Sequence, residues 1–236
     1  MNINTLTEQE DPMGAAIRDY FRQGKSAQLK VLSSLFDDDE MPVAHLFRSY
    51  HEMPPLEQRA LNEAREKVLD VGAGAGCHAL ALQERGFDVT AVDISPLSCE
   101  TMKERGVANV ECVNIFNQRF QERFDTLLLL MNGTGIAGKL SRLKQLMNPG
   151  AQILIDSSDL RYVYEDENGV LDVDLDGAYY GEVDYQMTYR NIKGKRFDWL
   201  YADSVVLAEC CRQCGLKCEI LAQGNHYDYL ARIVQM

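Results

Sequence analysis

The chain has 236 residues, of which 46% are hydrophobic, and this composition is typical of one soluble globular domain with or without an appendage. Its net charge of −12, from 24 basic and 36 acidic residues, argues against nucleic acid as a partner, because phosphate binding needs Lys and Arg. The N-terminus lacks the basic and apolar regions of a signal peptide, and the apolar run at 127–131 is too short to cross a bilayer. We therefore expect a cytoplasmic protein with no membrane partner.

The seven cysteines are interpreted as reduced thiols, because their number is odd and no secretion signal is visible. Four of them form the segment CCRQCGLKC at 210–218, which raises the question of a metal site. No second CxxC pair and no histidine at ligand spacing accompanies them. We predict no metal, and we interpret the segment as a helix that uses Cys as a small apolar residue.

The first 65 residues are predicted to form an N-terminal helical cap that is part of the same domain as the rest of the chain. Three segments, at 11–23, 26–36 and 54–64, carry apolar residues at helical spacing. They hold little core of their own, so we expect them to cover the residues that follow.

From residue 66 the sequence alternates between short apolar runs and amphipathic segments. The apolar runs, which we predict to be strands, are at 67–71, 88–92, 109–113, 124–131 and 148–158. The segments between them are predicted helices; one, at 95–106, begins with Ser95 and Pro96 and ends at Gly106. This alternation is typical of a parallel sheet with helices on both faces.

The pattern changes after residue 160. Residues 181–190 and 196–202 alternate polar and apolar side chains around the turn NIKGK, which predicts a β-hairpin inserted at about 178–202. The same hairpin offers an edge through which a homodimer would pair.

The last two predicted strands, at 216–223 and 227–235, are separated by only three residues. A parallel crossover needs a dozen residues or more, so these strands must run antiparallel. For residues 66–236 we therefore predict an α/β fold: a Rossmann-like, seven-stranded, mostly parallel sheet with an antiparallel last strand and helices on both faces.

The stretch VLDVGAGAG at 68–76 runs from a predicted strand directly into a glycine turn. Such a turn leaves backbone N–H groups free at the start of the next helix, and its missing Cβ atoms let a ligand come close. Asp93 ends the next strand, 21 residues after Gly72, where a carboxylate can accept from both hydroxyls of a ribose. The turn and the acid together predict an adenosine-containing cofactor; the alternative is a turn that only permits close packing of helix and sheet.

The glycines alone do not decide between two cofactors. The frame GAGCHA at 74–79 satisfies the dinucleotide fingerprint G-x-G-x-x-G/A, so an NAD-dependent oxidoreductase is one interpretation. Asp70 inside the strand, the reversed last strand and the long N-terminal cap argue against it.

VLDVGAGAG followed by Asp93 resembles motif I and its acidic partner in the class I S-adenosylmethionine (SAM)-dependent methyltransferases, over about residues 66–236. The resemblance implies SAM as the cofactor, with Asp70 supporting its amino group and Asp93 holding its ribose. It further implies two sets of contacts. Those to the methionine part are Gly72, Ala73 and Gly74, and those to the adenine and the sulfonium are Ile94, Asn114, Ile115, Met131 and Asn132. Asn114 departs from the acid that the family often has there, although its side chain can still accept from the adenine amino group.

The residues after the fourth predicted strand bear on the methyl acceptor. Enzymes that methylate exocyclic or amide nitrogens often carry N/D-P-P-Y/F at this place, whereas this chain has NGTG at 132–135. Together with the acidic charge, this difference argues against a DNA adenine or glutamine methylase and favours a small-molecule acceptor.

Carboxyl ends of strands and the cap supply the remaining candidate residues. Candidates for substrate binding are Asp156, Ser157, Tyr162, Trp199 and Tyr227. Candidate catalytic residues are His51, Asn132 and His226, and further candidate cofactor contacts are Arg48 and Tyr50. Plainer interpretations stand beside each: surface or capping histidines, an Asp or Asn that satisfies a turn, an Arg paired with the acidic surface, and aromatic residues of a half-buried hairpin.

The sequence therefore predicts a SAM-dependent methyltransferase that acts on a small molecule. A non-catalytic SAM-binding protein and an NAD-dependent oxidoreductase are the alternatives that it leaves open.

Overall fold

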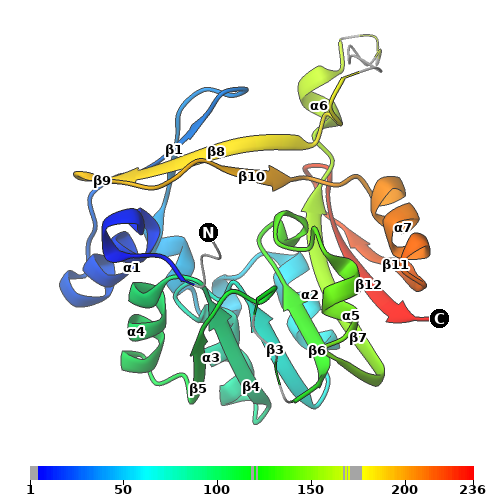
Figure 1. Ribbon diagram of the computed structural model, residues 1–236, viewed down its shortest axis with the longest axis horizontal. Coiled ribbons are helices and arrows are strands. Elements are labelled where there is room, and N and C mark those ends of the chain that lie inside the picture. The colour runs from blue at the N-terminus through cyan, green and yellow to red at the C-terminus, as the bar shows by residue number, and fades with distance from the viewer. Residues whose placement is uncertain (1–4, 118–119, 121, 167, 169, 171–176) are drawn as a thin grey trace.

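A computed structural model describes residues 5–117, 120, 122–166, 168, 170 and 177–236, and it is built from two sheets (Figure 1). The larger sheet has seven strands in the order β11-β12-β7-β6-β3-β4-β5. In that order the strands are β11 (Leu216–Gln223), β12 (Asp228–Gln235), β7 (Met147–Ser158), β6 (Phe124–Leu129), β3 (Lys67–Val71), β4 (Asp88–Asp93) and β5 (Asn109–Cys112). Among these, β12 pairs antiparallel with both of its neighbours, and the other pairs are parallel. The predicted mostly parallel sheet with a reversed last strand is confirmed.

Helices cover both faces of this sheet, as predicted. The helices on one face are α2 (Pro55–Glu63), α3 (Cys77–Glu84) and α4 (Pro96–Glu104), and those on the other are α5 (Leu140–Lys144) and α7 (Ser204–Gln213). In β6 Leu127 and Leu129 join the core under α5 and α7, whereas Leu128 joins the core under α2, α3 and α4. A strand buried on both faces needs such a continuous apolar run.

A second, antiparallel sheet has the strand order β10-β8-β1-β2, with β9 also paired to β8. Its strands are β1 (Leu29–Ser33), β2 (Asp39–Met41), β8 (Glu182–Tyr189), β9 (Ile192–Lys193) and β10 (Phe197–Leu200). The inserted hairpin is therefore confirmed. Because β8 pairs with β1 on one side and β10 on the other, its two edges are already used within this chain.

The prediction of a helix at 26–36 is wrong, and the N-terminal cap is helical only in part. Residues 29–33 form β1, in which Leu29 lies opposite Tyr189 and Val31 opposite Met187. Apolar residues at 29, 31 and 32 fit both a helical and an alternating pattern, so pairing with β8, distant in sequence, decides the outcome. The helices of this region are α1 (Pro12–Gln23) and α2, with short 3₁₀ turns at Glu8–Glu10, Val43–Phe47 and Tyr50–Glu52.

The second sheet lies above the end of the larger sheet at which β7 leads into the short helix α6 (Arg161–Tyr164) (Figure 1). Hydrogen bonds of buried hydroxyl groups connect the two sheets. Thr134, in the 3₁₀ turn η4 (Gly133–Gly135) after β6, donates to the Leu200 carbonyl at 2.7 Å and bonds the Ser157 hydroxyl at 2.8 Å. Ser157 in turn accepts from the Ala202 backbone N–H at 3.1 Å.

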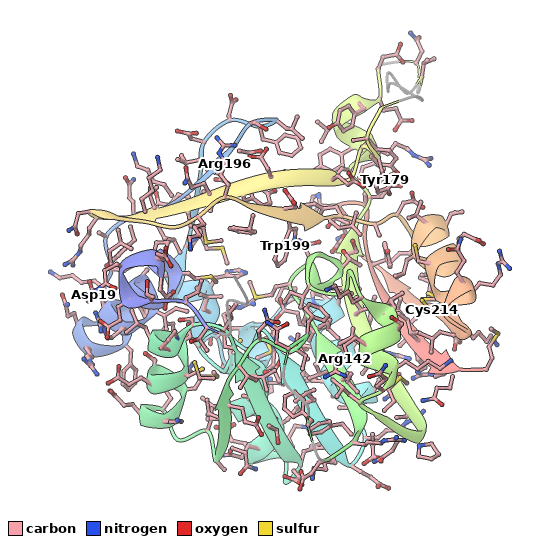
Figure 2. All side chains as sticks on the ribbon, in the orientation of Figure 1. Asp19, Arg142, Tyr179, Arg196, Trp199 and Cys214 are labelled. Atoms are coloured by element: carbon pink, nitrogen blue, oxygen red, sulfur yellow. The ribbon has the colours of Figure 1, made fainter. Side chains whose placement is uncertain are left out.

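Trp199, on β10, points from the second sheet toward the larger one (Figure 2). Its indole packs against Gly135, where a Cβ atom would lie 2.1 Å from the Trp199 Cε2 atom. The missing side chain of Gly135 is what allows this contact.

No helix within the described residues is long and apolar enough to cross a membrane. The cysteines are all free; Cys211 is buried on α7 as a small apolar residue, while Cys210 is exposed. Across the described ranges, no group of three or more His, Cys, Asp or Glu side chains is placed to hold a metal ion.

The contact between Trp199 and Gly135 predicts a stability difference between two glycines of the same loop. Gly135→Ala is expected to lower the free energy of unfolding by about 1–3 kcal/mol, because the added methyl group must displace the indole. Urea unfolding followed by the fluorescence of Trp199, the single tryptophan, measures it. Gly138→Ala is the matched control, since a Cβ there meets nothing within 4 Å. Equal stability of the two variants would contradict the packing described.

Candidate functional site

Of the three glycines in the turn after β3, Gly72 and Gly74 differ in what their missing side chains allow. Gly72 and Gly74 both have positive φ angles, 72° and 57°, which favour glycine. A Cβ atom on Gly72 would lie 2.6 Å from Ile136, so this glycine permits close packing, whereas a Cβ on Gly74 would meet nothing within 4 Å. Gly74 is therefore the position at which a ligand can approach the backbone.

Three backbone N–H groups of this turn are engaged in hydrogen bonds within the protein. Gly72 and Ala73 donate to the Val92 carbonyl at 2.9 and 3.1 Å, and Gly74 donates to Asp93 Oδ2 at 2.9 Å. These bonds fix the shape of the turn against the end of β4.

Asp93, at the end of β4, is half-buried beside the turn. Its second oxygen, Oδ1, accepts from the Ser95 N–H at 2.8 Å. Burial raises the pKa of Asp93 to about 6, and the N–H donors of Ser95 and Gly74 lower it only in part. Each carboxylate oxygen retains a further lone pair for a ligand hydroxyl.

The residues predicted beside the adenine lie on neighbouring loops. Ile94 follows Asp93 directly and accepts through its carbonyl from the Leu6 N–H at 3.0 Å. Asn114 follows β5, and its side-chain oxygen accepts from the Phe116 N–H at 2.9 Å. Ile115 is buried in the core under α5 and α7.

Four buried charged side chains, which we call the buried charge chain, lie beside the turn: Arg48, Glu57, His78 and Asp70. Arg48 Nη2 donates to both carboxylate oxygens of Glu57 at 3.0 Å, and its Nε donates to the His45 carbonyl at 2.6 Å. The Glu57 Oε2 atom lies 2.7 Å from His78 Nε2. Asp70, on β3, is close enough to His78 for their charges to interact.

Burial and neighbouring charges oppose each other along this chain. Burial alone would lower the pKa of His78, but Cys77, Glu57 and Asp70 outweigh it and hold that pKa well above its usual value. Burial raises the pKa of Asp70, against the charge of His78 and the Ala79 N–H. Burial would also raise the pKa of Glu57, yet His78 and Arg48 bring it below its usual value.

Two atoms of the buried charge chain have no hydrogen-bond partner among the described residues. They are Nη1 of Arg48, a charged donor, and Oδ2 of Asp70, an acceptor. Leaving such atoms unpaired in the interior costs free energy, so a ligand that supplies one anionic and one cationic group would be favoured here.

The end of β6 borders a cavity of about 230 Å³, lined among others by Glu57, Met131, Asn132 and Asp156. Met131 and Asn132 have left-handed φ angles of 65° and 62°, which are unusual for residues other than glycine. The Asp156 carboxylate, at the end of β7, holds them by accepting from the N–H groups of Met131, Asn132 and Gly133 at 3.2, 2.8 and 3.3 Å. Burial and the charge of Glu57 raise the pKa of Asp156 to about 6, and the three N–H donors lower it only in part.

A second cavity, of about 390 Å³, adjoins the first through Asp228, which lines both. Tyr227 lines this second cavity and stacks on Tyr162 with ring centroids 5.4 Å apart. Both rings are about half exposed. His226, the neighbouring candidate base, is exposed, and its backbone N–H donates to Asp228 at 3.0 Å.

Three predicted site residues have other contacts. The Tyr50 hydroxyl donates to Asn62 at 3.0 Å and its ring lies under Arg85, at the far end of α3, about 12 Å along that helix from the glycine turn. His51 is exposed and meets Tyr50 edge-on at 5.3 Å. Ser157 is 1% exposed, and its hydroxyl serves the bonds between the two sheets.

Sequence reasoning missed Glu57 and His78. His78 lies within the GAGCHA frame, where the fingerprint leaves its position unspecified. Glu57 follows two prolines in a polar helix and carries no motif. Only the pairing of α2 with α3 in space reveals their contact.

Comparisons by sequence and by structure both match this chain to methyltransferases. A family model described as a methyltransferase domain matches residues 68–150. A solved SAM-dependent methyltransferase from Bacteroides fragilis, in complex with S-adenosyl-L-homocysteine, is 51% identical over 98% of this chain and 97% of its own, with a TM-score of 0.91. The CcbJ methyltransferase from Streptomyces caelestis has a similar fold, with a TM-score of 0.60 at 13% identity over 97% of this chain and 99% of its own.

A curated relative gives a partial match. The ubiquinone biosynthesis O-methyltransferase of Saccharophagus degradans is 29% identical over 126 residues, which are 47% of this chain. The chain thus spans about half, 53%, of that relative's length.

The raised pKa of Asp93 predicts a pH-dependent affinity for S-adenosylhomocysteine. Below a pH of about 6 the carboxyl group becomes protonated and loses acceptor capacity, so the affinity is expected to fall by up to about tenfold per pH unit. Calorimetric titrations between about pH 5 and pH 8 measure this dependence. Asp93→Asn is expected to bind weakly without this step, and a step of the same size in that variant would assign the dependence to another group.

Proposed function

The chain belongs to the S-adenosylmethionine-dependent methyltransferases, and we propose that it transfers the methyl group of that cofactor to a small-molecule acceptor in the cavity at the ends of β6 and β7. The size of that cavity, about 230 Å³, supports a small acceptor. So does the second sheet, which covers the end of the larger sheet where β7 leads into α6 (Figure 1). A protein substrate would need an open groove instead.

The unpartnered atoms of the buried charge chain carry the proposal for the methionine end of the cofactor. Arg48 Nη1 suits its carboxylate and Asp70 Oδ2 suits its ammonium group. The two atoms have opposite polarity and lie beside the turn at which Gly74 leaves open space. In this role Arg48 keeps the ion pair with Glu57 and adds a second one.

The adenosine end is proposed to lie against Asp93 and the loops after β4 and β5. Asp93 would accept from both ribose hydroxyls, since each of its oxygens has a lone pair beyond the N–H that it already accepts. Ile94, Asn114 and Ile115 would border the adenine. The bound cofactor supplies a methyl group that its sulfonium already activates.

The acceptor is proposed to lie at Met131 and Asn132, with access through the second cavity at Tyr162 and Tyr227. Methyl transfer is an in-line displacement, so the enzyme mainly has to hold the nucleophile close and aligned. Asp156 would serve this by fixing the backbone that carries Asn132, and Trp199 by supporting the same loop at Gly135. A base such as His51 or His226 is needed only for a nucleophile that must lose a proton.

Ligand titration tests the cofactor assignment. S-adenosylhomocysteine and SAM are expected to bind, and Asp93→Ala is expected to weaken both by about 100-fold, the loss of two charge-assisted hydrogen bonds. Asp88→Ala, on the same strand but with an exposed side chain, is the control and should bind as the wild type does. Binding of NAD in place of SAM would contradict the proposal.

Turnover separates an enzyme from a SAM-binding protein without activity. Incubation with methyl-labelled SAM and fractionated metabolites is expected to transfer label to a small molecule, and Asn132→Ala should reduce the rate by about tenfold or more through lost alignment. The screen includes hydroxyl acceptors, because the curated relatives are named O-methyltransferases. Tight binding with no labelled product in any fraction would favour the non-catalytic alternative.

A further inference from the structure

The proposed function gives roles to Arg48 and Asp70 of the buried charge chain but none to the Glu57–His78 pair. Glu57 lies on α2 and His78 is the second residue of α3, and both are nine-tenths or more buried. Their 2.7 Å contact joins Arg48 at one end of the chain to Asp70 at the other.

With Glu57 and Asp70 ionised, the charges of this chain balance when His78 is protonated. Arg48 and His78 then carry two positive charges, and Glu57 and Asp70 two negative ones. The groups that face His78 are Glu57 from α2, Asp70 from β3 and the Cys77 thiol from its own helix, and each favours the imidazolium form. A neutral His78 would leave two buried carboxylates to share the one guanidinium of Arg48.

We propose that His78 and Glu57 are positioning residues that make the site select ligands with a zwitterionic amino-acid end. This inference rests on the proposed function, because it assumes that Arg48 and Asp70 receive that end of the cofactor. Glu57 holds Nη2 of Arg48 in a two-point contact, which directs the guanidinium and leaves Nη1 available. His78 balances Glu57 and Asp70, so Asp70 is not drawn to Arg48 and keeps Oδ2 for an ammonium group.

A comparison of two ligands isolates this role. S-adenosylhomocysteine carries the amino-acid end, whereas 5′-methylthioadenosine has the same adenosine and sulfur without it. His78→Gln removes the charge but keeps a side chain that can bond to Glu57. We expect it to lose affinity for S-adenosylhomocysteine by about 10- to 100-fold and to bind 5′-methylthioadenosine within about twofold of the wild type.

Glu84→Gln is the control, because Glu84 lies on the same helix as His78 and its side chain is exposed. It should keep the wild-type ratio of the two affinities. An equal loss of both ligands in His78→Gln would show a merely structural role and overturn the inference. The wild type is titrated first: failure to bind S-adenosylhomocysteine at all would refute the proposed function, which is a different result from a lost preference between the two ligands.

A measurement on the unmodified protein keeps the inference falsifiable if His78→Gln does not fold. Nitrogen-15 spectra of histidine side chains distinguish imidazolium from imidazole rings. Of the four histidines, His45, His51 and His226 are exposed and His78 is buried, and the buried ring is expected to stay protonated at about pH 8. Finding all four rings neutral at that pH would overturn the inference.

Discussion

The Glu57 carboxylate, with Arg48 on one side and His78 on the other, joins the first 65 residues of the chain to the glycine turn. Its two partners come from different parts of the fold, Arg48 from the loop before α2 and His78 from α3, and His78 in turn interacts with Asp70 on β3. Removing one partner of a buried ion pair typically costs about 3–5 kcal/mol, because the other charge is left uncompensated. Glu57 is therefore both a structural link and the centre of the site proposed for the methionine end.

The acceptor side depends on a comparable link at the end of β7. Asp156 holds the strained backbone of Met131 and Asn132, and the next residue, Ser157, bonds both Thr134 and Ala202. Asp156 and Ser157, neighbours on β7, thus fix the loop after β6 and its contact with the second sheet. Because their side chains alternate in direction, one strand end can serve the cavity and the seam between the two sheets.

The larger sheet was predictable because its signals are local. Apolar runs such as Leu127–Leu130 mark strands buried on both faces, and the three-residue turn at 224–226 leaves only an antiparallel last pair. The strand at 29–33 was not predictable, since its partner β8 lies more than 150 residues away and its apolar spacing also fits a helix. The local sequence pattern predicts secondary structure where the partners of a segment are close in sequence. For residues 29–33, pairing with a distant strand determines the secondary structure instead.

The residues of the candidate site likewise fall into those that the sequence predicts and those that only the fold brings together. Asp70, Gly74 and Asp93 belong to one strand–turn–helix–strand unit, so the sequence alone made Gly74 and Asp93 candidates, and the family resemblance added Asp70. Glu57 and His78 meet only through the packing of α2 on α3, and Tyr50, chosen for its place in the sequence, lies instead at the far end of α3. The GAGCHA frame, which fits a dinucleotide pattern, places His78 in a buried ion pair.

The adenosine side is likewise shared between the N-terminal region and the larger sheet. Asp11 begins α1 by accepting from the Gly14 N–H at 2.8 Å, and it also accepts from the Ser95 hydroxyl at 2.5 Å. Ser95 in turn donates its N–H to Asp93, so one serine bridges two carboxylates. The charge of Asp11 adds to burial in raising the pKa of Asp93, and the position of α1 therefore affects how readily Asp93 ionises for its proposed role at the ribose. Residues before the glycine turn would thus act on both ends of the cofactor as proposed, through Arg48 and Glu57 at one end and through Asp11 at the other.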